Sequence, residues 1–195
     1  MDGNGKQPFY NVHMKYWEQY QSFFPEDMRI HGHHLPAEEY WSWNDCPIHL
    51  DRFPASNPAS SDLIHGAGGN GRLLAPYARL LQTNGYDVVA PDFPPYGLSS
   101  VDSLALLDYG LWVQMLADFV EREIQRDGKP VVLFGVSIGG MLAYHAAVKS
   151  GGVKGLIATT FVDTSNPSVR DQLAPNKLVS RAGKWIMDTF PCMLD

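Results

Sequence analysis

Short apolar runs alternate with amphipathic stretches from residue 61 onward. The runs that predict strands are residues 61–66, 86–92, 130–136 and 153–163. The stretches whose apolar residues recur at helical spacing are residues 73–81, about 108–127, and 138–149. Regular alternation of strand and helix is typical of an α/β protein, so we expect a mostly parallel sheet with helices on both faces.

Local signals set the ends of these elements. Asp108 is a natural N-cap, and Asp127-Gly128 is a stop signal for the helix that it begins. The run at 130–136 is continuously apolar, which predicts a strand buried on both faces. The run at 61–66 is a weaker strand candidate because Ser61 and Asp62 interrupt it.

The first sixty residues follow a less regular pattern. Residues 14–24 have helical spacing, and Pro25 ends that helix. Residues 40–53 carry apolar positions on both sides of Asn44-Asp45, which predicts a hairpin with its turn at that pair. The aromatic residues of this region are expected to cover the sheet.

Composition and charge exclude several function classes. The 195 residues carry a formal net charge of −6, which argues against a nucleic-acid partner. The sequence contains no apolar run of about 18 residues, so no membrane span is expected. Its start is polar and does not read as a signal peptide. The only cysteines are Cys46 and Cys192, which favours a reducing, cytoplasmic location.

The segment Gly135-Val136-Ser137-Ile138-Gly139 fits the pattern G-x-S-x-G between a predicted strand and a predicted helix. A turn this sharp strains the serine backbone and needs glycines where side chains would clash. It would lift the Ser137 hydroxyl above the carboxyl edge of the sheet. The backbone N–H of Ile138, at the helix start, could then stabilise an oxyanion. The alternative is a turn of small residues that only serves helix–strand packing.

Two further loops follow predicted strands. Residues 65–72, HGAGGNGR, expose backbone, and the N–H of Ala67 could be a second oxyanion donor. A phosphate-binding loop is excluded because the lysine and Ser/Thr of a P-loop are absent. Residues 91–100, PDFPPYGLSS, follow the next strand.

In their order, these three motifs resemble the α/β-hydrolase family, in particular its branch of monoacylglycerol lipase-like and lysophospholipase-like serine hydrolases. The resemblance covers residues 40–165 and implies an α/β-hydrolase fold. It implies that Ser137 is the nucleophile and that the N–H groups of Ala67 and Ile138 form the oxyanion hole. By the same resemblance His65 and Gly66 shape the oxyanion loop, and Asp92 and Ser99 are structural loop residues.

The resemblance also implies a domain organisation. Residues 1–39 would be an N-terminal helical extension, residues 40–165 the N-terminal part of the hydrolase core, and residues 166–195 the start of a helical cap after the last strand. The C-terminal strands of the fold would be absent. We therefore expect the chain to be the front part of a hydrolase.

A catalytic serine needs a base and an acid that orients it. After Ser137 the only histidine is His145, two turns further along the same predicted helix and too far away to be the base. Asp163 is a candidate acid. In the family the acid more often follows the next strand, which this sequence does not contain. We therefore expect the triad histidine beyond residue 195, and the acid as well if it is not Asp163.

These features predict a serine hydrolase of carboxylic esters, with esterase or lipase-like chemistry, that forms an acyl-enzyme at Ser137. Its substrate would be a small apolar ester, and it would need no cofactor. No metal is expected, since His31, His33 and His34 lie in a loop without a carboxylate or cysteine at ligand spacing. Thioester, amide and peptide hydrolysis stay open. If 195 residues are the whole protein, the alternative is a catalytically inactive binding protein for a small ligand.

Overall fold

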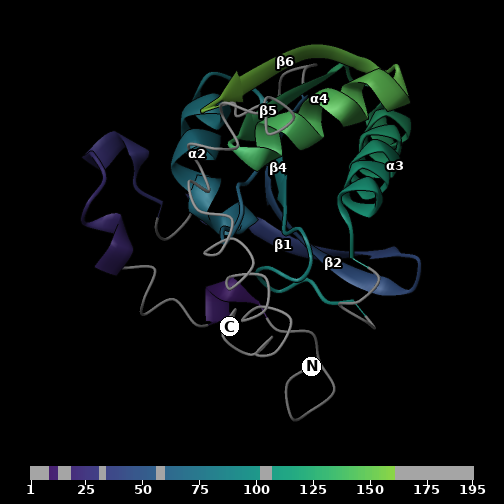
Figure 1. Ribbon diagram of the computed structural model, residues 1–195. Coiled ribbons are helices and arrows are strands. Elements are labelled where there is room, and N and C mark those ends of the chain that lie inside the picture. Colours follow the sequence, from purple (N-terminus) through teal and green to yellow (C-terminus); the bar gives the residue numbers. More distant parts are fainter. Residues whose placement is uncertain (1–8, 13–18, 31–33, 56–59, 102–106, 161–195) are drawn as a thin grey trace, which may run out of the picture. The chain divides into compact units, whose positions relative to one another are not determined.

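The computed structural model describes residues 9–12, 19–30, 34–55, 60–101 and 107–160. Its described part is built on one six-stranded sheet with the order β1-β2-β4-β3-β5-β6 (Figure 1). The strands are β1 (Ala37–Trp43), β2 (Cys46–Phe53), β3 (Ser60–Ile64), β4 (Asp87–Pro91), β5 (Val131–Val136) and β6 (Val153–Thr159). Strands β3 to β6 are mutually parallel, whereas β2 runs antiparallel to both β1 and β4. This confirms the expected mostly parallel sheet.

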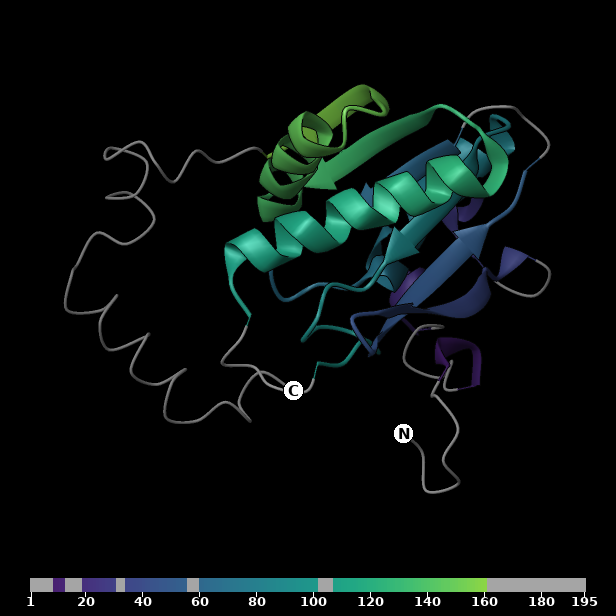
Figure 2. The ribbon, with the colours of Figure 1, turned by 90° about the vertical axis from the view of Figure 1, so that its right-hand side faces the viewer.

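Helices cover both faces of the sheet, as expected. They are α2 (Ala75–Thr83), α3 (Tyr109–Asp127) and α4 (Ile138–Ser150), with short 3-10 turns η1 (Tyr10–Val12), η2 (Glu26–Met28) and η4 (Gly71–Leu74). Helices α3 and α4 pack side by side on one face, and α2 lies on the other (Figures 1 and 2). None of the helices in the described ranges has the length and hydrophobicity needed to cross a bilayer.

The predicted caps and turn are present. The Asp108 carboxylate accepts a hydrogen bond from the N–H of Leu111 at 2.7 Å, and Gly128 ends α3 at φ 69°. Asn44 and Asp45 have φ of 48° and 63° in the turn between β1 and β2. Positive φ at both central residues is the geometry that matches the twist of a two-residue hairpin.

Strand β5 separates two hydrophobic clusters. Val131 and Leu133 are fully buried against α3 and α4. Phe134 and Val136 point to the α2 side and are only partly buried. Among the described residues, the expectation that this strand is buried on both faces is therefore right for one face and incomplete for the other. On that second face α2 covers less of the sheet than α3 and α4 together cover on the first.

Two strands depart from simple hydrophobic patterning. Asp62 is fully buried and Ser61 nearly so, because β3 lies at the sheet centre between β4 and β5. Strand β6 forms the sheet edge among the described residues, and its Leu156 and Ile157 are 36% and 49% exposed. The end of the predicted last strand, at 161–163, the predicted cap at 166–195, and most of the predicted helix at 14–24 lie outside the described residues.

Candidate active site

Ser137 occupies the sharp turn that joins β5 to α4. It is the N-cap of α4 and has φ 57° and ψ −124°. A non-glycine residue at positive φ is strained, and its surroundings must hold it there. The Ser137 N–H donates to the carbonyl oxygen of Thr159 at 2.9 Å, which ties the turn to the end of β6. The backbone strain that the sequence motif predicts is thus present at this serine.

The motif glycines allow backbone segments to approach closely. A Cβ on Gly135 would overlap the carbonyl oxygen of Gly139 in the following helix. A Cβ on Gly139 would overlap the carbonyl oxygens of Ile64 and His65 at the end of β3. Gly139 therefore lets the first turn of α4 pack directly against β3, which brings Ser137 next to the loop that follows that strand.

The loop after β3 lies beside Ser137. A Cβ on Gly66 would lie 3.3 Å from the Ser137 Cβ and 3.9 Å from its Oγ. As the first residue of α4, Ile138 has a backbone N–H with no acceptor within the helix. Ala67 and Ile138 line the same small pocket. The structure thus places Ala67 and Ile138 on one small pocket, and Ser137 beside Gly66, which lines the same pocket.

Aromatic side chains form the wall of this pocket. It is lined by His65, Gly66, Ala67, Phe93, Tyr96, Trp112, Ile138 and Leu142. The Trp112 Nε1–H donates to the carbonyl oxygen of Pro94 at 2.7 Å, so α3 holds the loop after β4. The wall of this pocket is therefore mostly apolar.

His65 links the two loops at the pocket. The Phe93 N–H donates to its Nε2 at 2.9 Å, so the proton is on Nδ1, which donates to the carbonyl oxygen of Gly66 at 2.7 Å. Burial lowers the pKa of His65 and keeps the ring neutral. Both ring nitrogens are therefore used in joining the two loops, and neither is free to accept the Ser137 proton.

No histidine of the described ranges is placed to act as a base for Ser137. His145 is an exposed residue two turns along α4, and its ring contacts that of Tyr109 edge-on at 5.6 Å. It borders a separate hollow on the α3–α4 surface. His34 lies 2.9 Å from the Arg79 guanidinium. Asp163, the candidate acid, lies outside the described residues.

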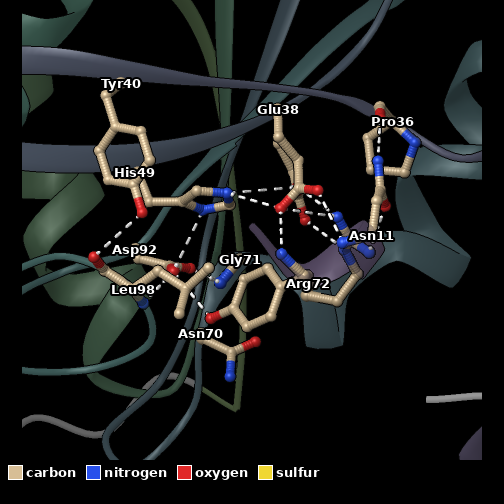
Figure 3. Close-up of polar contacts among 12 residues, drawn as sticks. Asn11, Pro36, Glu38, Tyr40, His49, Asn70, Gly71, Arg72, Asp92 and Leu98 are labelled. Carbon is tan, nitrogen blue, oxygen red and sulfur yellow. Dashed lines mark hydrogen bonds and ion pairs between the residues drawn. The ribbon is translucent and has the colours of Figure 1, made fainter. Parts of the chain in front are cut away.

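A buried charged cluster lies behind the pocket wall, and sequence reasoning did not predict it (Figure 3). It consists of Glu38, His49, Asp51, Arg72 and Asp92, whose side chains are at most 3% exposed. Arg72 donates to both carboxylate oxygens of Asp51, at 2.6 and 2.7 Å. His49 Nε2 lies 2.9 Å from Glu38 and its Nδ1 lies 3.2 Å from Asp92.

The carboxylates of this cluster stabilise positive charge on His49. Burial alone would lower the pKa of His49, but Asp92 and Glu38 raise it to about 9. Burial opposes ionisation of Asp92, yet His49 and the N–H donors of Leu98 and Gly71 hold its pKa below the ordinary value. His49 is therefore an imidazolium at neutral pH. Glu38, His49 and Asp51 lie close enough together to be considered as metal ligands. The Arg72 guanidinium, however, already pairs with both carboxylates.

Asp92 and Ser99 are structural loop residues, in agreement with the role implied by the sequence resemblance. Asp92 is fully buried and accepts from the N–H groups of Gly71 and Leu98, at 2.6 and 2.8 Å. Ser99 Oγ accepts from the N–H of His49 at 2.8 Å. A local signal of this network is that His49 and Asp51 alternate with the apolar Ile48 and Leu50 in the second strand of the hairpin, but this signal does not show which residues they meet.

Comparison with known proteins identifies the family and the fold of the chain. The model of the alpha/beta hydrolase family matches residues 63–192. A search of curated proteins gave no match. Among solved structures, a soluble variant of monoglyceride lipase from Saccharomyces cerevisiae, in complex with a substrate analog, is 23% identical with a TM-score of 0.58. The alignment covers 66% of this chain and 45% of the lipase.

Two other similar structures belong to enzymes with activities other than lipase activity. A thioesterase domain from the curacin biosynthetic pathway is 24% identical with a TM-score of 0.59, over 80% of this chain and 62% of that domain. An N-acyl homoserine lactonase is 24% identical with a TM-score of 0.52, over 64% of this chain and 45% of the lactonase. The chain spans less than two thirds of the length of each of these three structures, and the likeness to them is one of fold.

Proposed function

Because the chain belongs to the alpha/beta hydrolase family, we propose that it is part of a serine hydrolase that acts on carboxylic esters through an acyl-enzyme at Ser137. The observation that carries this proposal is the position of Ser137. It sits at positive φ where α4 begins, beside Gly66 and a pocket bordered by Ala67 and Ile138. A turn that only served packing would not need the strain that Ser137 bears.

In the proposed reaction the Ser137 Oγ attacks the carbonyl carbon of the ester, and the hydroxyl proton passes to a general base. The carbonyl oxygen becomes an oxyanion that accepts hydrogen bonds from the N–H groups of Ala67 and Ile138. The positive end of the α4 dipole favours the same negative charge. The intermediate then expels the alcohol, which takes the proton from the base, and leaves the acyl group on Ser137.

Water completes the cycle. It loses a proton to the base, attacks the acyl carbon and releases a carboxylic acid, while Ser137 recovers its proton. The described histidines are used elsewhere, so the proposal assigns the base to a histidine outside the described residues, together with the acid that orients it. Asp163 stays a candidate for that acid.

Apolar esters suit the pocket better than charged substrates do. Phe93, Trp112 and Leu142 line it, and the His65 ring is neutral. The similar structures are named as a lipase, a lactonase and a thioesterase, all of which transfer an acyl group to water. Their shared chemistry supports ester hydrolysis here, and the pocket wall would select among acyl groups.

The test uses the natural full-length protein with p-nitrophenyl esters and a fluorophosphonate probe that modifies activated serines. We expect turnover and labelling in the wild type. Ser137→Ala should lower kcat/KM by roughly a thousandfold or more and abolish labelling, because it removes the nucleophile.

The matched control is Ser100→Ala, which changes an exposed serine that follows the pocket loop. It should keep both turnover and labelling. Ester turnover that survives Ser137→Ala would disprove the assignment of the nucleophile. A wild-type protein that binds an ester analogue but neither turns over esters nor reacts with the probe would favour the inactive binding protein instead.

A further inference from the structure

We propose that His49 is a positioning residue for the pocket: it holds Asp92 in place, and through Asp92 it sets the two loops that carry the oxyanion donor and the aromatic wall. Nothing in the sequence motifs assigns a role to His49. The inference about geometry is independent of the proposed function, and only its consequence for catalysis rests on that function.

Asp92 joins the two loops directly. Its Oδ1 accepts from the N–H of Gly71, which ends the loop carrying Ala67. Its Oδ2 accepts from the N–H of Leu98, in the loop that contains the wall residues Phe93 and Tyr96. A single carboxylate therefore fixes both loops, and its orientation determines where each one lies.

His49 and Tyr10 set the orientation of that carboxylate. His49 Nδ1 lies 3.2 Å from Asp92 Oδ2, and the Tyr10 hydroxyl donates to the same oxygen at 2.8 Å. The Tyr10 ring stands edge-on to the His49 ring, with 5.0 Å between the ring centroids. Figure 3 shows His49 with Asp92, Glu38 and Tyr40 around it. A Cβ on Gly97 would overlap the Asp92 carboxylate, so the loop backbone closes over it from the other side.

The hairpin and η4 hold His49 in turn. Glu38 of β1 lies 2.9 Å from His49 Nε2, and Asp51 of β2 lies 4.0 Å from it. Arg72, which pairs with Asp51, also lies 3.4 Å from Glu38. The Tyr40 ring packs edge-on against His49. A protonated imidazole at this point balances the charge of carboxylates on three segments. A neutral residue would leave Asp92 without this charge partner, held only by its hydrogen bonds from Gly71, Leu98 and Tyr10.

The chain offers a matched control in a second ionic cluster on the same hairpin. Arg52 of β2 pairs with Glu123 of α3 at 2.9 Å and with Glu39 of β1 at 2.7 Å. These residues do not line the pocket. Arg52→Gln should therefore cost stability, as loss of a partly buried ion pair does, without moving the pocket wall.

The experiment compares Tyr10→Phe, His49→Gln and Arg52→Gln in the full-length protein labelled with 5-fluorotryptophan. The reporter is the ¹⁹F resonance of Trp112, identified by its loss in Trp112→Phe, because this indole binds the Pro94 carbonyl in the wall loop. We expect the Trp112 resonance to shift or broaden in Tyr10→Phe and His49→Gln and to stay unchanged in Arg52→Gln. If His49→Gln does not fold, the Trp112 resonance of the wild type is followed from pH 6.5 to pH 9.5, where deprotonation of His49 should shift it.

An unchanged Trp112 resonance in the folded Tyr10→Phe and His49→Gln variants would overturn the inference, and so would an equal shift in Arg52→Gln. With p-nitrophenyl acetate we expect kcat to fall by about tenfold in His49→Gln with KM changed less than about twofold, because misplaced oxyanion donors act on the transition state. A wild-type protein without ester turnover would remove the proposed function, while the Trp112 result would still decide the role of His49.

Discussion

Ser137 is held in a strained conformation by residues that have almost no side chain. Its positive φ is possible because Gly135 and Gly139 let β5, α4 and the end of β3 approach within backbone contact. Gly66 approaches Ser137 closely as well, and a Cβ at that position would lie 3.9 Å from the Ser137 Oγ. The strained backbone of Ser137 and the close backbone approaches at Gly135 and Gly139 depend on each other, because a Cβ at either glycine would overlap backbone atoms and disfavour the turn.

Gly139→Ala should destabilise the protein by roughly 2–4 kcal/mol, as an overpacked core position does. The reason is that the new Cβ would overlap the carbonyl oxygens of Ile64 and His65, which belong to the sheet backbone and cannot move away cheaply. Urea unfolding followed by circular dichroism measures this loss. We expect Gly139→Ala to lower ester turnover as well, because α4 would be pushed away from the oxyanion loop.

The control for this substitution is Gly155→Ala in β6. Its new Cβ would meet only Val132 side-chain carbons at 3.5 Å, an ordinary contact. Its stability should therefore stay within about 1 kcal/mol of the wild type. Equal losses for the two variants would show that the close backbone approach at Gly139 is not what limits the turn.

The sequence predicted the residues of the turn but not the cluster behind it. The motif around Ser137 is local, and its glycines have a physical reason that can be stated from neighbouring residues alone. Glu38, His49 and Asp92 are instead brought together by the pairing of three strands. Taken one at a time they are ordinary polar residues, so no local pattern could indicate that they meet in the interior.

At the scale of single elements, α3 is the link between the sheet and the pocket wall. It begins at an Asp108 cap and ends at Gly128, and near its start it carries Trp112 into contact with Pro94. Both ends were predictable because capping depends on short-range hydrogen bonds. The start of the helical segment formed by η4 and α2 was not predictable in this way, since η4 begins at Gly71, two residues before the predicted helix. There Gly71 packs against the backbone of Ala90, a tertiary contact.

Asp108→Ala should lower the free energy of unfolding by about 1 kcal/mol, because the Leu111 N–H loses its acceptor at the start of α3. Since Trp112 directly follows Leu111, we also expect its ¹⁹F resonance to broaden as the first turn frays. Thermal unfolding and the Trp112 signal measure the two effects. Asp108→Asn keeps an oxygen at the cap and should lose only a few tenths of a kcal/mol. A loss as large as that of the alanine variant would show that the cap is not the cause.

At the scale of the described molecule, the ionic cluster connects segments that the sheet does not hold. The N–H groups of Tyr10 and Asn11 donate to the Glu38 carboxylate, and Arg72 donates to the Asn11 side chain. The segment before the hairpin, the hairpin itself and the two pocket loops therefore share one set of buried charges. Disturbing those charges should affect all four together, and pH is the least invasive way to do so.

His49 makes the stability depend on pH above neutrality. Its pKa rises from 6.5 to about 9 on folding, so the folded state binds the proton more tightly than the unfolded state. The stabilisation is fully present below pH 6.5 and is lost as pH rises through 9, by ~3 kcal/mol at most. The two neighbours of His49 with raised pKa values, Asp51 and Tyr10, titrate mostly outside this window. Burial raises the pKa of Asp51 only to about 6, and burial and Asp92 keep Tyr10 neutral.

Urea unfolding at pH 6.5 and at pH 9.5, followed by tryptophan fluorescence, measures this dependence. We expect the free energy of unfolding of the wild type to fall between the two pH values by a few kcal/mol, and that of His49→Gln to fall by much less, because glutamine has no proton to lose. Ionisable groups away from His49 contribute equally to both proteins and cancel in the difference. Parallel losses in the two proteins would mean that folding does not raise the pKa of His49, so that its charge does not hold Asp92.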